Sequence, residues 1–263
     1  MHSRESQLKA FGRLLDILDE LRAKCPWDKE QTNESLRPLT LEETYELSEA
    51  LLEGNSEEVS KELGDILLHI LFYAKIGSEK QEFDIQDVCE KLSSKLIYRH
   101  PHIFGDVQVA DARQVEENWE KLKLKEKGGN RSVLAGVPEV LPSMIKAFRM
   151  QDKARGVGFD WDDRSQVWDK VREEFTELMV EVENMDAERM EDEFGDLFFS
   201  LINAARLYQI NPDNALERVN KRFRKRFNYL EAQTIAQGRS LKDMTLAEMD
   251  VYWNEAKALE KKQ

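Results

Sequence analysis

The chain has 263 residues, of which 52 are acidic and 39 are lysine or arginine, so its formal net charge is −13 at pH 7. That charge disfavours a nucleic acid or an anionic membrane as a partner. The chain has only two cysteines, Cys25 and Cys89, which favours a reduced protein over a disulfide-linked one. It shows neither a signal-type N-terminus nor an apolar run long enough to cross a membrane, so we expect a cytoplasmic protein.

Helical periodicity dominates the first half of the sequence. Apolar residues from Phe11 to Leu21 recur at the spacing of one helix face, which predicts a helix that ends before Pro26. Thr40 is the predicted N-cap of the next helix, and Asp84 is that of a later one. The helices predicted after the first cover residues 41–52, 59–77, 85–98 and 115–127.

The second half repeats this plan after a stretch that contains glycines and prolines. Its predicted helices cover residues 143–155, 166–183, 187–208, 212–236 and 246–261. Alternation with a period of two, the pattern of a half-buried strand, is nearly absent. We therefore predict an all-α protein, a tandem repeat of two helical-bundle domains at residues 1–127 and 143–263 joined by a linker at 128–142.

The same acidic pattern occurs once in each half, at residues 42–65 and 173–196. Every acidic residue of the second copy lies the same number of positions after its equivalent in the first, so the two copies align without a gap. Each copy has two adjacent glutamates, then a third glutamate one helical turn later, and finally Glu-x-Gly-Asp beyond a predicted turn. Residues three apart share one face of a helix, and the turn lets the two helices run antiparallel, so we expect the carboxylates to face one another. The first copy comprises Glu42, Glu43, Glu46, Glu62 and Asp65, and the second comprises Glu173, Glu174, Glu177, Glu193 and Asp196.

These facing carboxylates predict a metal site, because they would repel one another without a cation. Oxygen ligands favour Mg²⁺ or Mn²⁺. Iron would suit a histidine such as His69, but the second copy has Ser200 there, so we interpret His69 as a core residue. A strongly apolar run follows each aspartate, so we expect Asp65 and Asp196 to lie where the helix enters the core. The predicted metal ligands are Glu43, Glu46, Glu62 and Asp65 in the first half and Glu174, Glu177, Glu193 and Asp196 in the second.

Such clusters suit phosphoryl-type transfer, which mainly requires positioning and charge neutralisation. No Walker-type glycine loop is present, so phosphate binding would depend on side chains and metal. Glu42 and Glu173 lie out of phase with the predicted ligands, and we expect them to polarise the attacking water. The catalytic candidates are Glu42, Glu43, Glu173 and Glu174.

A second repeated pattern lies in the helices that follow the carboxylates. A pair of cationic residues and a tryptophan–lysine pair, each with a four-residue step, recur in both halves. Each pair shares a helix face, where cations can hold a polyphosphate and tryptophan can stack on a nucleobase. In the alternative interpretation, the tryptophans anchor the core and the cations stay solvated. The predicted nucleotide-binding residues are Lys95, Arg99, Trp119 and Lys123 in the first half and Arg222, Arg226, Trp253 and Lys257 in the second.

The chain resembles the MazG family over nearly its whole length, through the segments CPWDKEQT at 25–32, TLEETYE at 40–46, RHPH at 99–102 and GFDW at 158–161. The resemblance implies a Mg²⁺-dependent nucleoside triphosphate pyrophosphohydrolase that forms a nucleoside monophosphate and pyrophosphate with broad base tolerance. It also implies a homodimer whose C-terminal domain performs most of the catalysis. The chain departs from the family pattern at one position, where it has Arg222 and the resemblance leads us to expect a lysine. Arginine keeps the charge but changes the hydrogen-bond geometry, so fine substrate preference stays open.

Other interpretations remain open from the sequence. A non-catalytic nucleotide- or metal-sensing module that binds a partner protein would keep the same site but would need no extra carboxylate such as Glu42 or Glu173. A second alternative is an enzyme that acts on modified or alarmone-related nucleotides. A third is that the acidic pattern belongs to ordinary solvated helix faces and binds no metal. The sequence leaves open which phosphorus is attacked and whether the N-terminal site is active.

Overall fold

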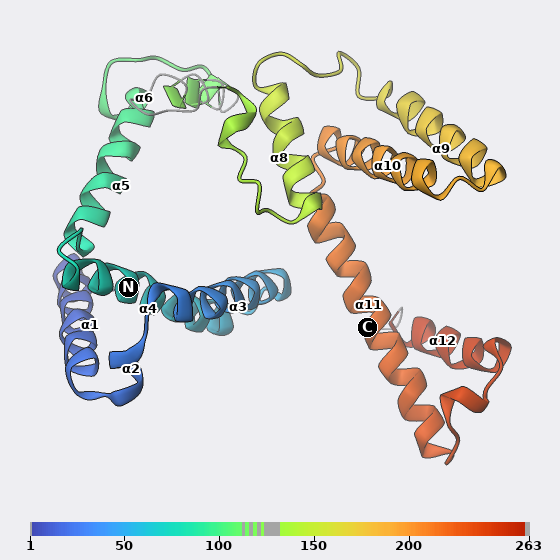
Figure 1. Cartoon of the computed structure of the whole chain (residues 1–263), viewed down its shortest axis with the longest axis horizontal. Helices are drawn as coiled ribbons and strands as arrows, with labels where there is room; N and C mark the ends of the chain where they lie inside the picture. The colour runs from blue at the N-terminus through green and yellow to red at the C-terminus, as the bar shows by residue number, and fades with distance from the viewer. Residues whose placement is uncertain (1, 112–113, 116–117, 120–121, 124–131, 261–263) are drawn as a thin grey trace. The chain divides into compact units, whose positions relative to one another are not determined.

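The computed structural model describes residues 2–111, 114–115, 118–119, 122–123 and 132–260, and every regular element in these residues is a helix. The all-α prediction is therefore confirmed. The chain forms two compact units, residues 1–110 and 111–263 (Figure 1). No helix in the described part of the chain is both long and apolar enough to span a membrane.

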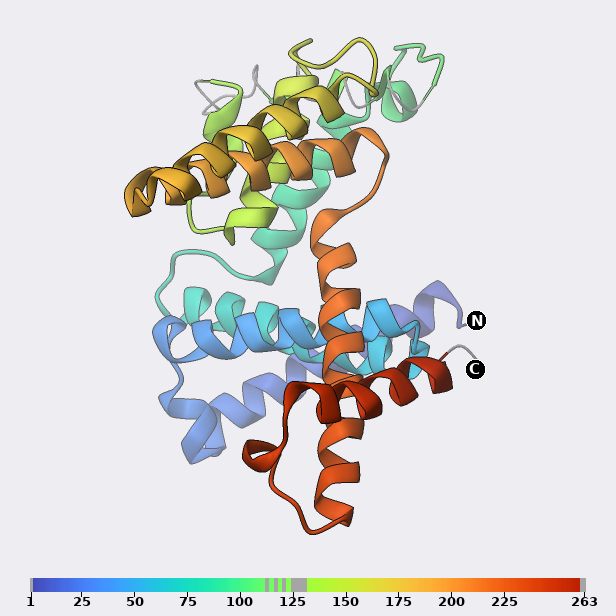
Figure 2. The same ribbon diagram turned by 90° about the vertical axis from the view of Figure 1, so that its right-hand side faces the viewer.

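The first unit is built around a hairpin of two long helices, α3 and α4, which lie side by side (Figures 1 and 2). Gly54 ends α3 with a φ of 70°, in the left-handed region that glycine adopts without strain. Asn55 then caps α4 through its side-chain oxygen, so the chain reverses within two residues. The helices of this unit are α1 (Arg4–Lys24), α2 (Pro26–Glu30), α3 (Asn33–Glu53), α4 (Ser56–Glu79), α5 (Ile85–Arg99) and α6 (Pro101–Phe104).

The start of α3 corrects a sequence prediction. The N-cap is Thr32, whose side chain accepts a hydrogen bond from the Ser35 amide, while the Ser35 hydroxyl accepts one from the Thr32 amide. Thr40 lies inside the helix, and its hydroxyl donates to the Leu36 carbonyl at 3.0 Å. Helix α3 therefore begins upstream of the predicted start and continues through Pro38, which lies inside it.

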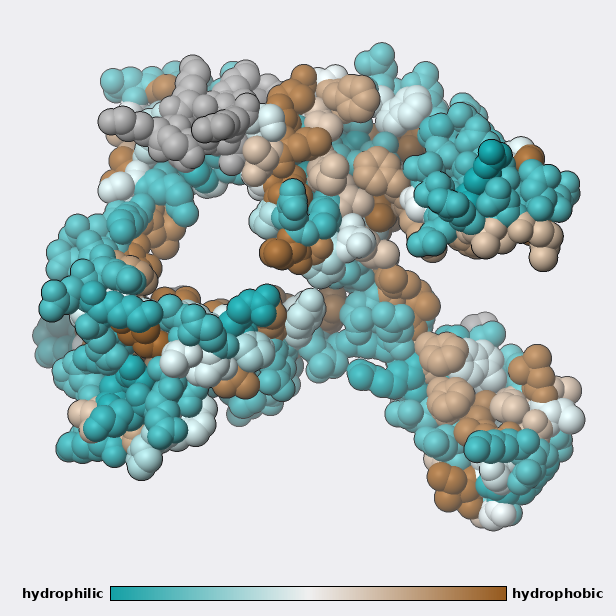
Figure 3. Space-filling model, viewed as in Figure 1, coloured by the Kyte–Doolittle hydropathy of each residue, from teal (hydrophilic) through white to brown (hydrophobic). Residues whose placement is uncertain are grey.

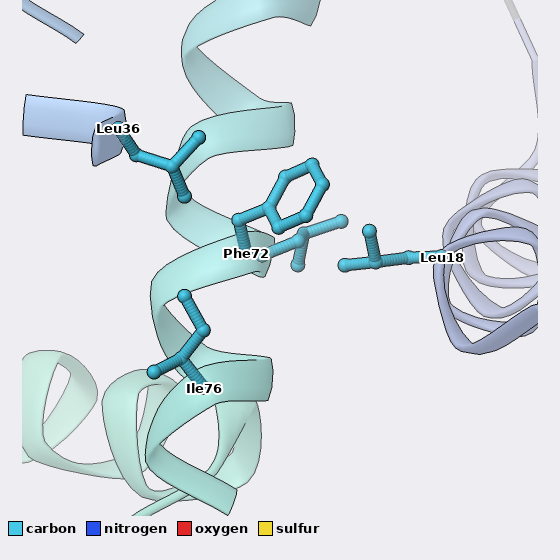
Figure 4. Close-up of a cluster of buried hydrophobic side chains, with 5 residues drawn as sticks. Leu18, Leu36, Phe72 and Ile76 are labelled. Carbon is cyan, nitrogen blue, oxygen red and sulfur yellow. The ribbon is translucent and has the colours of Figure 1, made fainter. Parts of the chain in front are cut away.

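The core of the first unit joins three helices. Leu18 from α1, Leu36 from α3, and Phe72 and Ile76 from α4 are fully buried and pack together (Figure 4). Burying a side chain of this size stabilises the fold by about 1.5–3 kcal/mol, so the cluster holds the α3–α4 hairpin against α1. His69 is also buried, which confirms its interpretation as a core residue.

The second unit contains a matching hairpin of α9 and α10, again side by side (Figures 1 and 2). Met185 ends α9 with a φ of 55°, at the position that Gly54 occupies in the first unit, and Asp186 caps α10. Helix α8 packs on α10, and α12 packs on α11. The elements are η1 (Leu134–Gly136), α8 (Ser143–Arg155), α9 (Val167–Asn184), α10 (Ala187–Leu207), α11 (Pro212–Ala236), η2 (Leu241–Asp243) and α12 (Leu246–Glu260).

The sequence-predicted helices match the structure closely outside α3. The predictions for residues 143–155 and 212–236 coincide with α8 and α11, and Asp84 caps α5 as expected. In the helix predicted at 115–127, the described residues are helical, and the others lie outside the described ranges, as do residues 128–131 of the predicted linker. The domain boundaries at 127 and 143 stay predictions.

Candidate metal centre and adjoining cavity

Three carboxylates meet between α9 and α10 in the second unit. Glu174 and Glu177 lie one turn apart on α9, and Glu193 reaches them from α10. Each offers one oxygen atom, and these three oxygens all lie within 4.8 Å of one another. Glu174 is buried, whereas Glu177 is exposed. The i, i+3 spacing and the antiparallel hairpin thus bring together residues that are distant in sequence.

The first unit contains a second cluster of the same kind. Glu43 from α3 and Glu62 and Asp65 from α4 each offer an oxygen within 4.8 Å of the other two. Glu62 is only 3% exposed. Glu46 is not one of these three residues, but its negative charge acts on Glu43. The repeated acidic pattern therefore produces two similar clusters, one in each unit.

One carboxyl group in each cluster retains its proton more strongly than an isolated carboxylate does. Burial, followed by the charges of Glu177 and Asp196, raises the pKa of Glu193 above its usual value. Burial, followed by the charges of Asp65 and its neighbours, raises the pKa of Glu43 in the same way. In both cases the deprotonated carboxylates destabilise one another, and a bound cation would relieve that repulsion.

Two buried oxygen atoms provide an independent test of whether these residues fit a metal. The Oε2 atoms of Glu62 and Glu193 are buried and have no hydrogen-bond partner. The other oxygen of Glu62 is paired with Lys61 at 2.8 Å, so only Oε2 is left over. Buried polar atoms are normally hydrogen-bonded or metal-bound. Each cluster of carboxylate oxygens contains one such atom, which fits a hard divalent cation.

The depth of the carboxylates differs from the sequence expectation. We expected Asp65 and Asp196 to lie in the core, but Asp65 is half-buried and Asp196 is exposed. The deeply placed members are instead Glu62 and Glu174. Asp196 lines a cavity open to solvent, which explains its exposure although an apolar run follows it. Phe199, from that apolar run, lines the same cavity.

The residues expected to polarise water lie beside the clusters rather than in them. Glu173 is exposed and is paired with Lys170 at 2.8 Å. Lys170 also contacts Glu174 at 2.7 Å, and these two hydrogen bonds raise the pKa of the Lys170 ammonium group. Glu42 is exposed as well. Lys170 was missed from the sequence because the equivalent position in the first unit is Leu39, so a search for repeated residues passes over it.

A cavity of about 660 Å³ adjoins the second cluster. Pockets of roughly 300–1,000 Å³ commonly hold small organic ligands. Helices α8 and α10 and the loop between α8 and α9 contribute most of its walls. Its lining residues are Leu134, Met150, Gln151, Ala154, Gly158, Phe159, Asp160, Trp161, Lys170, Glu174, Asp196, Phe199, Ser200, Asn203 and Arg206.

The predicted nucleotide-binding residues of the second unit gather on α11 and α12. The Arg226 guanidinium lies 5.7 Å from the centre of the Trp253 ring and pairs with Glu260 at 2.6 Å. Trp253 also packs against Phe223, with ring centres 5.1 Å apart. In the described part of the chain, no hydrogen bond or ion pair joins Arg226 to the α9–α10 cluster. Arg222 and Lys257 are exposed on the same two helices.

The corresponding residues of the first half show a similar local pairing. Lys123 lies 5.6 Å from the centre of the Trp119 ring. On α5, Lys95 is exposed and Arg99 is half-buried. In the second unit, the surface of the α9–α10 pair differs from that of α12 (Figure 3). Hydrophilic residues cover the outer end of the α9–α10 pair, whereas paler and apolar residues gather over α12.

Comparison with known proteins identifies relatives over the whole chain. The family described as MazG nucleotide pyrophosphohydrolase domain matches residues 31–104 and 164–230, which include both carboxylate clusters. The chain is 40% identical over 250 residues to the nucleoside triphosphate pyrophosphohydrolase/pyrophosphatase MazG of Thermotoga maritima, an alignment that covers 94% of this chain and 95% of the relative. It is 37% identical over 260 residues to the nucleoside triphosphate pyrophosphohydrolase of Escherichia coli K12, covering 96% and 99%. It is 45% identical over 256 residues to the uncharacterized protein YabN of Bacillus subtilis, of which it spans 52%.

Proposed function

Because this chain belongs to the MazG nucleotide pyrophosphohydrolase family, we propose that it hydrolyses nucleoside triphosphates to nucleoside monophosphates and pyrophosphate. The observation that carries the proposal is the contact between a carboxylate cluster and a cavity of ligand size, which share Glu174. An acidic cluster alone would bind an ion. A cluster that opens into a cavity can hold both the ion and an organic substrate.

Of the residues assigned to the reaction, Lys170, Glu174 and Asp196 line the cavity. Glu174, Glu177, Glu193 and Asp196 would hold Mg²⁺, and a bound Mg²⁺ supplies charge neutralisation for phosphates and lowers the pKa of a bound water. Lys170 offers a further cation next to Glu173 and Glu174. We assign Glu173 to orienting the attacking water, because it is exposed one position from a ligand. Arg222, Arg226, Trp253 and Lys257 remain our candidates for further nucleotide contacts.

The cluster in the first unit has the same carboxylates, and we propose that Glu43, Glu46, Glu62 and Asp65 hold a second ion there. We assign this ion a supporting role, with Glu42 as the adjacent acidic residue. Lys95, Arg99, Trp119 and Lys123 remain our candidates for further nucleotide contacts. A metal-sensing function without catalysis is the second candidate. It is favoured by one observation, namely that the acidic cluster is repeated in the first unit, whereas Gln151, Ser200 and Asn203 of the cavity wall are not.

We also propose a cytoplasmic homodimer that binds no nucleic acid. The net charge of −13 supports the exclusion of nucleic acid. Three phenylalanines, Phe175, Phe194 and Phe198, are 54%, 46% and 59% exposed on α9 and α10, and a second copy would cover them. The quaternary state is measured directly by sedimentation equilibrium.

The test of the function is product analysis with a panel of nucleoside triphosphates in Mg²⁺, and again with the metal chelated. We expect equal amounts of monophosphate and pyrophosphate with several bases, and loss of both products on chelation. Release of inorganic phosphate and a diphosphate would contradict the proposed reaction. Failure to cleave any nucleotide, with the protein folded and binding Mg²⁺, would favour the sensing function.

A further inference from the structure

We propose that the cavity beside the α9–α10 cluster binds the nucleobase, and that Gln151 recognises it by accepting a hydrogen bond from a base N–H group. This inference rests on the proposed function, because a nucleotide is the expected ligand. It goes further by naming the side chain that recognises the base and by separating the base from Trp253. The argument begins with the orientation of the Gln151 amide.

Gln151 lies on α8 and is only 7% exposed. Its Nε2 atom donates to the backbone carbonyl of Phe199 on α10 at 2.8 Å. That bond fixes the amide, because exchanging the nitrogen for the oxygen would place two acceptors together. The Oε1 atom is buried and has no hydrogen-bond partner. An unsatisfied buried acceptor in the wall of a cavity is an atom that a ligand can satisfy.

A hydrogen-bond donor accompanies this acceptor. Asn203 also lines the cavity, and its Oδ1 atom accepts hydrogen bonds from the Arg206 guanidinium at 2.8 and 3.1 Å. Arg206 is itself anchored by Asp160 through two hydrogen bonds. Since Oδ1 is occupied by Arg206, Asn203 offers its Nδ2 donor to a ligand. Every nucleobase carries an N–H group next to an acceptor on its pairing edge, so an acceptor and a donor together suit a base without selecting one.

The remaining walls fit the faces of a planar ring. Phe159, Trp161 and Phe199 are aromatic, and Met150 adds a flexible apolar side chain. Aromatic walls stack on any base, which agrees with a broad base preference. At the other end the cavity reaches Glu174 and Asp196, the proposed metal ligands. A nucleotide with its base among the aromatic residues would therefore direct its phosphates towards the carboxylates.

The first unit provides an internal comparison. At the repeat spacing, Asn203 and Ser200 of the cavity correspond to Phe72 and His69, and both of these larger side chains are buried, with 2% and 7% exposure. His69 Nδ1 lies 2.7 Å from the hydroxyl of Thr40, which holds the ring in place. Gln151 corresponds to Glu20, which is exposed.

The two units thus share their carboxylates but differ at three positions of the cavity wall, Gln151, Ser200 and Asn203. A scaffold feature would have been copied with the helices, as the metal-binding atoms were. The difference is expected if the cavity serves an organic ligand that only the second unit binds.

Trp253 has contacts of its own. Its ring packs against Phe223 and lies beside the Arg226 guanidinium. Because Trp253 does not line the cavity, we assign it to orienting Arg226 and to nucleotide contacts other than the base.

The test compares two ligands that differ in one base amino group and cannot release pyrophosphate. These are AMP and purine riboside 5′-monophosphate, which lacks the 6-amino group. Calorimetry in Mg²⁺ should give tighter binding of AMP to the wild-type protein by about 10- to 100-fold, because the second ligand leaves Gln151 Oε1 unpaired. In Gln151→Leu, which lacks the acceptor, the ratio of the two dissociation constants should fall to about one.

The ratio is informative even if the variant is less stable, because the fraction of folded protein cancels between the two ligands. Gln166→Leu is the matched control, since Gln166 is exposed at the start of α9 and lies outside the cavity wall, and it should keep the wild-type ratio. Equal binding of both ligands by the wild type, an unchanged ratio in Gln151→Leu, or no AMP binding would each overturn the proposal.

The outcome is separable from the proposed hydrolysis. The expected ratios without any pyrophosphate release from ATP would support the base site and reject the reaction. Pyrophosphate release with an unchanged ratio in Gln151→Leu would support the reaction and reject the base site.

Discussion

Glu62 and Glu193 occupy equivalent positions in the two units, and each has an Oε2 atom that is buried without a hydrogen-bond partner. The two residues are on α4 and α10, the second helices of the two hairpins. One such atom could be a local irregularity. Its recurrence at the same place in both clusters indicates a shared requirement for a positive partner, which a divalent cation satisfies.

We expect two divalent ions to bind per chain, one at each cluster. Glu193→Gln should remove one site and Glu62→Gln the other, because the amide keeps the shape of the side chain but loses the charge. A calorimetric titration with Mn²⁺ measures the number of binding sites per chain. Glu183→Gln, at an exposed glutamate of α9 outside the cluster, is the control and should bind two ions. Two remaining sites in Glu193→Gln would contradict this assignment.

The Asp160–Arg206 pair predicts a pH-dependent contribution to stability. Burial would raise the pKa of Asp160, but hydrogen bonds from Arg206 and from the Trp161 amide outweigh it and lower the pKa below 3.8. Since the folded state lowers this pKa, the stabilisation is present above pH 3.8 and is lost as the pH falls through the lowered pKa. Asp160→Asn should therefore reduce the free energy of unfolding at pH 7 by on the order of 2–3 kcal/mol.

Urea unfolding at pH 7, 5 and 3 measures this dependence. The difference in unfolding free energy between wild type and Asp160→Asn should persist at pH 5 and shrink at pH 3. Asp162→Asn changes an exposed neighbouring carboxylate and should have little effect at any pH. A difference between wild type and Asp160→Asn that stays constant from pH 7 to pH 3 would show that the charge of Asp160 is not responsible.

The end of α9 predicts a stabilising substitution. Met185 has a φ of 55° and an 80% exposed side chain, so it carries the strain of the left-handed region without a compensating packing contact. Met185→Gly should raise the free energy of unfolding by about 1 kcal/mol. The reciprocal change, Gly54→Ala, should lower it by a similar amount, because Gly54 has a φ of 70° although no atom would obstruct a Cβ there.

Thermal and urea unfolding of the two variants would measure the effect. A loss of stability in Met185→Gly would mean that the Met185 side chain makes a stabilising contact that its exposure does not suggest.

The sequence predicted the features that the two halves share. Repetition and the i, i+3 spacing were sufficient to identify Glu43 and Glu174 as cluster members, because helix geometry fixes which side chains meet. The predicted limits of α8 and α11 coincide with the observed ones. Pro142 lies just before α8, Pro212 begins α11, and apolar residues with helical periodicity follow in both. These signals are local, so the sequence contains them in full.

The features that distinguish the two halves were not predicted. Gln151 and Lys170 are replaced by Glu20 and Leu39 in the first unit, and their importance depends on the atoms that lie beside them in the fold. The prediction placed the N-cap at Thr40, whereas the capping box of Thr32 and Ser35 begins α3 further upstream. Which carboxylates are buried depends on tertiary packing, so the exposure of Asp196 could not be inferred from the apolar run that follows it.

The central claim is that the second unit performs the hydrolysis at its carboxylate cluster. It is tested most directly by comparing the rate of pyrophosphate release from ATP in Mg²⁺ between the wild type and two variants. Glu174→Ala and Glu43→Ala remove equivalent residues, one from each cluster. We predict that Glu174→Ala lowers kcat by about 100-fold or more and that Glu43→Ala changes it by about twofold at most. Full activity in Glu174→Ala, with loss of activity in Glu43→Ala, would contradict the claim and place the reaction in the first unit.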